Sequence, residues 1–145
     1  MVERPGLARA LLATGTTAVG DIDASGTSAR LAPGLGMRVV VYRELLDAGD
    51  PGRTAGALRA VGRRMRAHRR VRGGLSPHAP YTTSPGLLAG ARTLAHRRNL
   101  CCSIHWAETP EEGQWLEGAS GPLAALLAHS PTRSGLSLLE ESGLL

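Results

Sequence analysis

Four short apolar stretches, separated by stretches of helical periodicity, constrain the fold of this chain more than any other feature of its sequence. Each is rich in apolar or β-branched residues and is bounded by Gly, Pro, Ser or charged residues. Strands that alternate with helices are typical of repeated βαβ units, which build a parallel sheet covered by helices on both faces. The expected strands are "TTAVGDID" at 16–23, Met37–Tyr42, "VRGGLSP" at 71–77 and Leu100–His105.

Helical patterns fill the intervals between these strands. Ser84 is placed to accept a hydrogen bond from the first turn of a helix, and Pro85 suits the first helical position. Gly15 is placed to end an earlier helix in a left-handed conformation. The expected helices cover 4–15, Thr54–Arg70, Pro85–Arg98, Pro122–His129 and 137–145, with a polar loop after the last strand.

The length of the chain narrows the architecture. With 145 residues it is long enough for one ordinary domain, but a complete (β/α)8 barrel typically needs about 250 residues. We therefore predict a single α/β domain over residues 1–145, either doubly wound or part of a barrel.

The positive charge of the chain is not taken as a sign of a polyanionic partner. The net charge is +5, and all 17 basic residues are Arg, a bias that resembles GC-rich coding. The densest cluster, 63–72, is interpreted as the solvated face of a helix whose apolar stripe is Leu58, Val61 and Met65. A nucleic-acid-binding patch is the less favoured interpretation, because no aromatic residue is interleaved with the Arg residues.

The cysteines and the apolar runs bear on cellular location. Cys101 and Cys102 are adjacent in an expected strand, so their side chains point to opposite faces and are poorly placed to bond each other. We interpret both as core residues in a reducing cytoplasm. We expect no membrane association, because the sequence shows neither a signal-peptide pattern nor an apolar run of transmembrane length.

Chemically active residues follow the expected strands where these end. Parallel sheets carry their chemistry at the carboxyl ends of strands, and here those ends bear His78 and His105, with Glu108 three residues beyond the second histidine. A neutral imidazole can bind Zn²⁺ or Fe²⁺, and a nearby carboxylate can accept a proton from water. Further polar residues at the strand ends are Asp21, Asp23, Arg43 and Glu44.

Less specific interpretations remain for several of these residues. His78 could be a turn residue beside Pro77 and Pro80, and Asp21 could cap a loop. We interpret the other histidines as solvated and assign them no role; they are His68, His96 and His129. The chain contains no HxH, HExxH or CxxC motif, so spacing alone supplies no second metal ligand.

Two stretches resemble a known family. "SPHAPYTTSPGLL" at 76–88 and "IHWAETPEE" at 104–112 resemble the amidohydrolase superfamily, in the branch of the cytosine, guanine, S-adenosylhomocysteine and aminofutalosine deaminases and the triazine chlorohydrolases. "LLATGTTAVGDID" at 11–23 is similar to an earlier strand of these barrels. The resemblance extends from about Gly6 to the end, and it implies a partial (β/α)8 TIM barrel, strands two to five of eight.

The resemblance also implies roles for individual residues. His105 would be a ligand of a mononuclear Zn²⁺ or Fe²⁺ ion, and Glu108 would be the acid/base that moves protons. His78 would contact the substrate or its leaving group, and Tyr81 would shape the pocket. The binuclear members of the superfamily use a carboxylated Lys, which this sequence lacks. The family's HxH pair and its later His and Asp ligands have no counterpart in the sequence.

Three function classes follow. The resemblance implies a metal-dependent hydrolase, foremost a deaminase of an amino-substituted purine, pyrimidine or related ring, as part of a longer or complemented enzyme. The alternative is a catalytically inactive half-barrel fragment whose exposed edges pair with another copy or with a complementary chain. A basic binding module, motivated by the Arg residues of 63–72, is the third.

Overall fold

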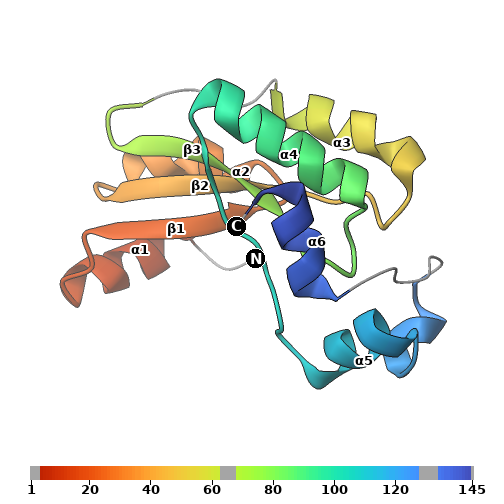
Figure 1. The fold of residues 1–145 in the computed structure, drawn as a ribbon. Coiled ribbons are helices and arrows are strands. Elements are labelled where there is room, and N and C mark those ends of the chain that lie inside the picture. The colour runs from red at the N-terminus through yellow and green to blue at the C-terminus, as the bar shows by residue number, and fades with distance from the viewer. Residues whose placement is uncertain (1–3, 63–67, 128–133, 145) are drawn as a thin grey trace.

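Four parallel strands form one sheet in the order β1-β2-β3-β4, so each strand pairs with its neighbour in sequence. The computed structural model describes residues 4–62, 68–127 and 134–144. Figure 1 shows the sheet with helices against it. The strands are β1 (Ala18–Asp23), β2 (Arg38–Leu45), β3 (Val71–Pro77) and β4 (Cys101–Cys102). This confirms the predicted α/β fold with four parallel strands.

Helices connect the strands and follow the last one. In Figure 1, α3 and α4 lie beside each other over the sheet, while α5 and α6 follow β4. The helices are α1 (Arg4–Ala13), α2 (Thr27–Leu31), α3 (Pro51–Gly62), α4 (Pro85–Arg98), α5 (Pro110–Gly118) and α6 (Gly135–Ser142), with 3₁₀ turns η1 (Ala32–Gly34) and η2 (Pro122–Ala125).

Strand β2 shows why the sheet needs helices on one face. Its side chains alternate between buried and half-buried, and Val39, Val41 and Leu45 belong to the buried set. Val39 and Val41 pack in a cluster that includes residues of α1, whereas Leu45 packs with residues of α3 and α4. These apolar contacts are what hold the helices on the sheet.

Tyr42 covers the opposite face of the sheet. A Cβ atom at Gly74 would lie 2.5 Å from Cδ1 of Tyr42, and one at Gly20 would lie 3.1 Å from its Cε2. The ring therefore occupies the space that these two glycines leave on the neighbouring strands. A side chain at either glycine would collide with the ring, so the close packing of Tyr42 depends on glycine at both positions.

Two predicted element ends are wrong. Helix α3 does not reach Arg70, because residues 68–70 form a turn in which His68 pairs with Val71; residues 63–67 lie outside the described part. The fourth strand pairs only at Cys101–Cys102 rather than over Leu100–His105. Beyond it, Ser103 N–H still donates to Leu75 C=O at 2.9 Å, so the chain continues alongside β3.

The interpretation of Cys101 and Cys102 as core residues is wrong. Both thiols are free, as predicted, but both residues are exposed. The physical reason is position: β4 is an edge of the sheet in the described part of the chain. Strand alternation therefore does not place either side chain in a core.

The segment after β4 is more ordered than predicted. The expected polar loop contains α5, whose Trp115 is fully buried with Leu88 of α4 and Leu139 of α6. The helix expected over Pro122–His129 is instead the short turn η2, and residues 128–133 lie outside the described part. Helix α6 confirms most of the last predicted helix and ends at Gly143, which has a φ of 70°.

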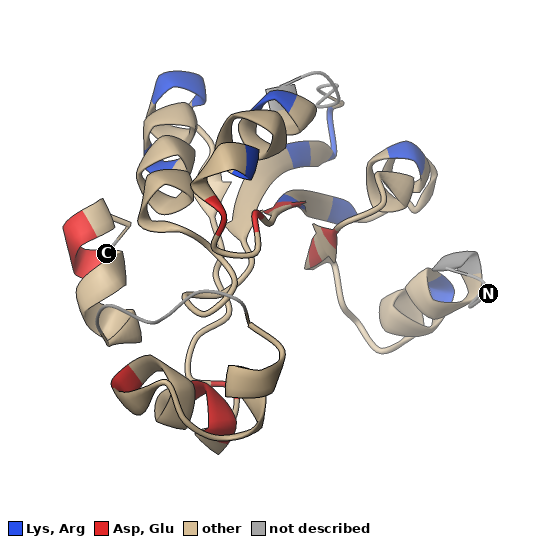
Figure 2. Ribbon diagram, turned by 90° about the vertical axis from the view of Figure 1, so that its right-hand side faces the viewer, with Lys and Arg blue, Asp and Glu red and all other residues tan. Residues whose placement is uncertain are grey.

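Charges are segregated along the molecule. Figure 2 shows basic residues on α3 and α4 and acidic residues on α5 and α6.

No helix among residues 4–62, 68–127 and 134–144 is long and apolar enough to cross a membrane.

Candidate active site

His78 and His105 lie next to each other where β3 and β4 end. His78 N–H donates to Leu45 C=O at 3.0 Å, and His105 N–H donates to His78 C=O at 2.9 Å. These bonds align the segments that follow three neighbouring strands. The two imidazole centroids are 5.3 Å apart, with an edge-to-face angle of 61°. The structure thus brings together the two histidines that the sequence placed at the carboxyl ends of two strands.

Glu108 turns back onto His105. Ala107 adopts a left-handed backbone with a φ of 54°, which is uncommon for a residue other than Gly. The turn brings Oε1 of Glu108 to 3.0 Å from Nδ1 of His105. The side chains are 42% and 33% exposed, so both remain accessible to a small molecule.

Thr82 orients the ring of His78. The Thr82 hydroxyl lies 3.2 Å from Ala79 C=O, to which it donates, and 2.7 Å from Nδ1 of His78. Because the hydroxyl has one proton, Thr82 Oγ1 accepts from Nδ1–H of His78. The lone pair of His78 is then on Nε2.

Tyr81 forms one side of the site. Its ring centroid lies 5.9 Å from that of His78, in an edge-to-face arrangement of 76°. Burial raises the pKa of Tyr81, and the negative charges of Glu108 and Glu112 raise it further. The phenol is therefore protonated at neutral pH and is available as a hydrogen-bond donor.

Glu112 and Thr109 hold the segment that carries Glu108. Oε2 of Glu112 accepts from Glu108 N–H at 2.9 Å, and Thr109 Oγ1 accepts from Glu112 N–H at 3.3 Å. Thr109 is the N-cap of α5. Sequence reasoning missed this pair, although "TPEE" at 109–112 has the pattern of a capped helix start with Pro in the first position.

Glu44 completes a group that fits a divalent metal ion. One potential ligand atom from each of Glu44, His78 and His105 lies within 4.8 Å of the other two, and all three residues are half-buried. Two imidazoles and a carboxylate are a donor set that Zn²⁺ and Fe²⁺ accept. We call these three residues the histidine cluster. The sequence placed Glu44 at a strand end, but no spacing motif links it to the histidines.

Asp23 lies outside this group. Its carboxylate accepts from the N–H groups of Gly26 at 2.8 Å and Ala29 at 3.1 Å, and it pairs with Arg43 at 3.4 Å. Burial by itself raises the pKa of Asp23, but these hydrogen bonds, the Arg43 charge and the Ser25 hydroxyl outweigh it and lower the pKa below 3.8. Asp23 is thus a structural residue of the loop that leads to α2.

Asp47 is a second structural carboxylate. It accepts from the Ser84 hydroxyl at 2.6 Å, from Ser84 N–H at 2.8 Å and from the Thr54 hydroxyl at 2.7 Å. Ser84 is the predicted N-cap of α4, and its hydroxyl also accepts from Leu87 N–H. Asp47 therefore ties the β2–α3 connection to the start of α4.

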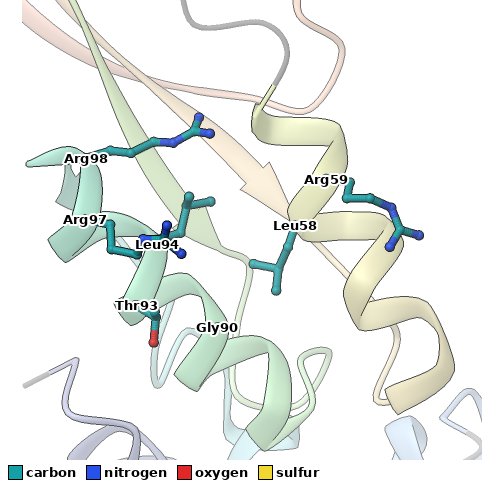
Figure 3. Close-up of a pocket in the computed structure, with 7 residues that line it drawn as sticks. All are labelled: Leu58, Arg59, Gly90, Thr93, Leu94, Arg97 and Arg98. Atoms are coloured by element: carbon teal, nitrogen blue, oxygen red, sulfur yellow. The ribbon is translucent and has the colours of Figure 1, made fainter.

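A groove between α3 and α4 offers a different kind of cavity. Its volume is about 570 Å³, and in Figure 3 Leu58 points from α3 toward α4. The lining contains no histidine, carboxylate or thiol, and so no general base for hydrolysis. The seven lining residues are Leu58, Arg59, Gly90, Thr93, Leu94, Arg97 and Arg98.

The remaining histidines are not part of the candidate site. His68 lies in the turn before β3, and His96 lies in the last turn of α4; both are exposed. Exposure agrees with their interpretation as solvated, although His68 is in a turn rather than in a helix. His129 lies outside the described residues.

Known proteins are similar to this chain in sequence and in fold. A 5-methylthioadenosine/S-adenosylhomocysteine deaminase from Thermococcus kodakarensis is 39% identical over 82 residues, which are 53% of this chain and 19% of the relative. A crystal structure of Helicobacter pylori aminofutalosine deaminase in complex with methylthio-coformycin has a TM-score of 0.74 at 19% identity, covering 91% of this chain and 34% of that one.

The crystal structure of a Xanthomonas campestris adenosine deaminase with bound zinc has a TM-score of 0.64 at 21% identity. The superposed region covers 97% of this chain and 31% of the Xanthomonas campestris chain. The chain thus spans only a minor part of each relative's length, and its four strands match a partial TIM barrel. The sequence pattern of the amidohydrolase family matches residues 6–127. Because that match covers the whole sheet and all of the histidine cluster, this chain belongs to the amidohydrolase family.

Proposed function

We propose that this chain is part of a longer or complemented metal-dependent amidohydrolase. The reaction of that enzyme is the deamination of an amino-substituted heterocycle, foremost an adenosine-type nucleoside. The observation that carries the proposal is the contact of His105 with Glu108 beside His78 at the carboxyl end of a parallel sheet. The names of the relatives, which are deaminases of adenosine derivatives, support the substrate class. Pyrimidines and related rings remain within the proposed class.

His105 is the proposed metal ligand from this chain. Its Nδ1 faces Glu108, so Nε2 is the atom available to an ion. When bound, Zn²⁺ or Fe²⁺ lowers the pKa of a water molecule so that hydroxide is accessible near neutral pH. Zinc is favoured because the Xanthomonas campestris structure holds it.

Glu108 is the proposed acid/base. Water forms a new C–O bond to the ring carbon that bears the amino group, and Glu108 takes up the proton released from that water. Glu108 then gives the proton to the amino nitrogen as the C–N bond breaks and ammonia leaves. Its exposure leaves the carboxylate free to move between these two positions, while Glu112 holds its backbone.

His78 and Tyr81 are the proposed substrate contacts. The fixed orientation of His78 directs Nε2 away from Thr82, and the Tyr81 phenol donates a hydrogen bond from the adjacent wall. A heterocycle held between these rings would keep its amino-bearing carbon close to Glu108.

The test is an assay of ammonia release by the zinc-loaded protein that contains this chain. The substrates are adenosine, 5'-methylthioadenosine and S-adenosylhomocysteine, with cytosine and guanine for comparison. Glu108→Gln should lower kcat by about 10²–10⁴-fold, the usual contribution of a general acid/base. Glu117→Gln, on the exposed side of α5, is the matched control and should leave kcat unchanged. Ammonia release that is absent from every substrate, or unaffected by Glu108→Gln, would contradict the proposal.

A second candidate is a catalytically inactive partial barrel that pairs with another copy or with a complementary chain. The specific observation in its favour is the open sheet: β1 and β4 are its edges in the described residues, and β4 exposes two cysteines. Unpaired edges of parallel strands are templates for pairing. Sedimentation of the purified chain would test it: a monomer at every concentration would argue against self-pairing.

We further propose that residues 1–145 form one domain and that the protein resides in the cytoplasm. Exposed thiols such as those of Cys101 and Cys102 persist in a reducing compartment. Limited proteolysis and localisation of a tagged protein would test these two assignments.

A further inference from the structure

We propose that the amino ends of β1, β2 and β3 form a binding site for a small molecule that carries a phosphate group. The site lies at the opposite end of the sheet from the candidate active site, which follows the carboxyl ends of the strands. The proposed function assigns nothing to this end of the sheet. Inorganic phosphate and phosphomonoesters share the chemistry that the site would recognise.

Backbone pairing brings Thr17, Arg38 and Arg70 to the same end of the sheet. Arg38 begins β2, while Thr17 and Arg70 immediately precede β1 and β3. Arg38 N–H donates to Thr17 C=O at 3.0 Å, and Val39 N–H donates to Arg70 C=O at 2.8 Å. These bonds align the starts of three neighbouring parallel strands. Two guanidinium groups and a hydroxyl therefore gather there.

A cavity of about 400 Å³ lies among these side chains, and its volume is in the range of small-molecule sites. Its described lining residues include three arginines and no carboxylate. Like charges around one cavity repel each other, and an anion inside it would reduce that repulsion. The described lining residues are Thr17, Gly36, Arg38, Arg69 and Arg70.

Hydrogen bonds hold two of the guanidinium groups in place. Nη2 of Arg38 donates to Thr17 Oγ1 at 3.3 Å, and Nη1 of Arg70 donates to Gly36 C=O. Gly36 has a φ of 76°, a left-handed backbone that glycine adopts without strain, and this conformation sets the direction of the loop. Each guanidinium keeps further N–H groups for an oxyanion, and the Thr17 hydroxyl keeps its own proton to donate.

These donors suit a phosphate group better than other anions. A guanidinium presents N–H groups in a planar fork that matches two oxygens of a phosphate. A tetrahedral phosphate directs its oxygens several ways and can reach groups from three strands, whereas the two oxygens of a carboxylate share one plane. A nucleic acid is less suited, because the described lining residues include no aromatic ring on which bases could stack.

The experiment titrates the full purified chain with inorganic phosphate and, separately, with adenosine 5'-monophosphate, by calorimetry at constant ionic strength. We expect saturable binding of one phosphate group per chain. Arg38→Gln and Arg70→Gln should each weaken binding by about tenfold, the usual loss when a hydrogen bond to a charged group is removed. Arg53→Gln removes the same charge from an exposed position of α3, and this control should bind like the wild type.

The two ligands distinguish the source of the phosphate group. Tighter binding of the monophosphate would identify a phosphomonoester site, and equal affinities would identify a site for the free ion; either result supports the proposal. Because the site is at the other end of the sheet from Glu108, phosphate binding and ammonia release are separate readouts. Loss of either one leaves the other assignment in place.

Three outcomes would overturn the proposal. The first is titration without saturation, and the second is equal weakening by Arg53→Gln, which would show attraction by net charge alone. The third is tighter binding of a single-stranded oligonucleotide than of the monophosphate, which would show a nucleic-acid surface. If a variant fails to fold, NMR of the wild type decides: phosphate should shift the side-chain Nε–H signals of Arg38 and Arg70 but not that of Arg53, and unshifted signals would refute the site.

Discussion

Arg43 and Glu44, neighbours near the end of β2, belong to two regions in which carboxylates have different roles. The Asp23–Arg43 pair lies on one face of the sheet, where Asp23 is 1% exposed and accepts hydrogen bonds from Gly26 and Ala29. The histidine cluster lies on the other face, where its three side chains are half-buried. The alternation of Arg43 and Glu44 on one strand separates the two regions.

The difference separates carboxylates that stabilise the fold from carboxylates that are available for chemistry. The Asp23 carboxylate is already surrounded by donors, so an added ligand would have to break existing bonds. In the cluster, hydrogen bonds constrain the rings through Nδ1 and leave Nε2 accessible. Both regions lie where strands end, and only the distribution of partners distinguishes them.

The largest expected effect is in the structural region. Asp23→Ala should lower the free energy of unfolding by about 3–5 kcal/mol, because it leaves the buried Arg43 guanidinium without its counter-charge. Urea unfolding measures this loss. The Asp23→Leu, Arg43→Met double variant should recover much of it, since both charges are then removed. A loss below about 1 kcal/mol for Asp23→Ala would show that the pair is not structural.

Acid should weaken the same region. The folded pKa of Asp23 lies below 3.8, and an unfolded Asp has a pKa of about 3.9. The stabilisation by Asp23 is therefore complete above the unfolded pKa and is lost as the pH falls through the folded pKa. Unfolding free energies measured from about pH 5 downward should fall less steeply for Asp23→Asn than for the wild type. Parallel curves would contradict the assignment.

A smaller effect is expected where the structural and chemical roles meet. Thr109→Ala removes the N-cap of α5 and should cost about 1 kcal/mol of unfolding free energy. It should also lower kcat of the active protein, because the Thr109–Glu112 bond helps to hold the backbone of Glu108. Thr109→Ser keeps the oxygen and is the control. Equal kcat values for both variants would show that the N-cap of α5 does not contribute to catalysis.

The smallest effect on stability is expected in the histidine cluster. Glu44→Gln keeps the shape of a half-buried side chain and should change the unfolding free energy by no more than about 0.5 kcal/mol. Urea unfolding of Glu44→Gln and Asp23→Ala under the same conditions measures the contrast between the two regions. A large destabilisation by Glu44→Gln would break the comparison.

Much of the fold could be predicted because its signals are local. Apolar strand segments, the Ser84–Pro85 helix start and the Gly residues at helix ends all act within a few residues. Helix α5 also had a local signal in "TPEE", which was missed. The exposure of Cys101 and Cys102 had none, because alternation within a strand does not reveal whether that strand is central or at an edge.

The amino-acid sequence by itself determined the order of the four strands, the helices α1, α3, α4 and α6, and the placement of His78, His105 and Glu108 at or just after strand ends. Both follow from short-range backbone preferences and from the direction of parallel strands. Only the tertiary structure decided that Glu44 joins the histidines while Asp23 and Asp47 are used in hydrogen bonds of the fold. These partners are up to 61 positions apart for Glu44 and His105, and strand pairing and loop packing bring them together.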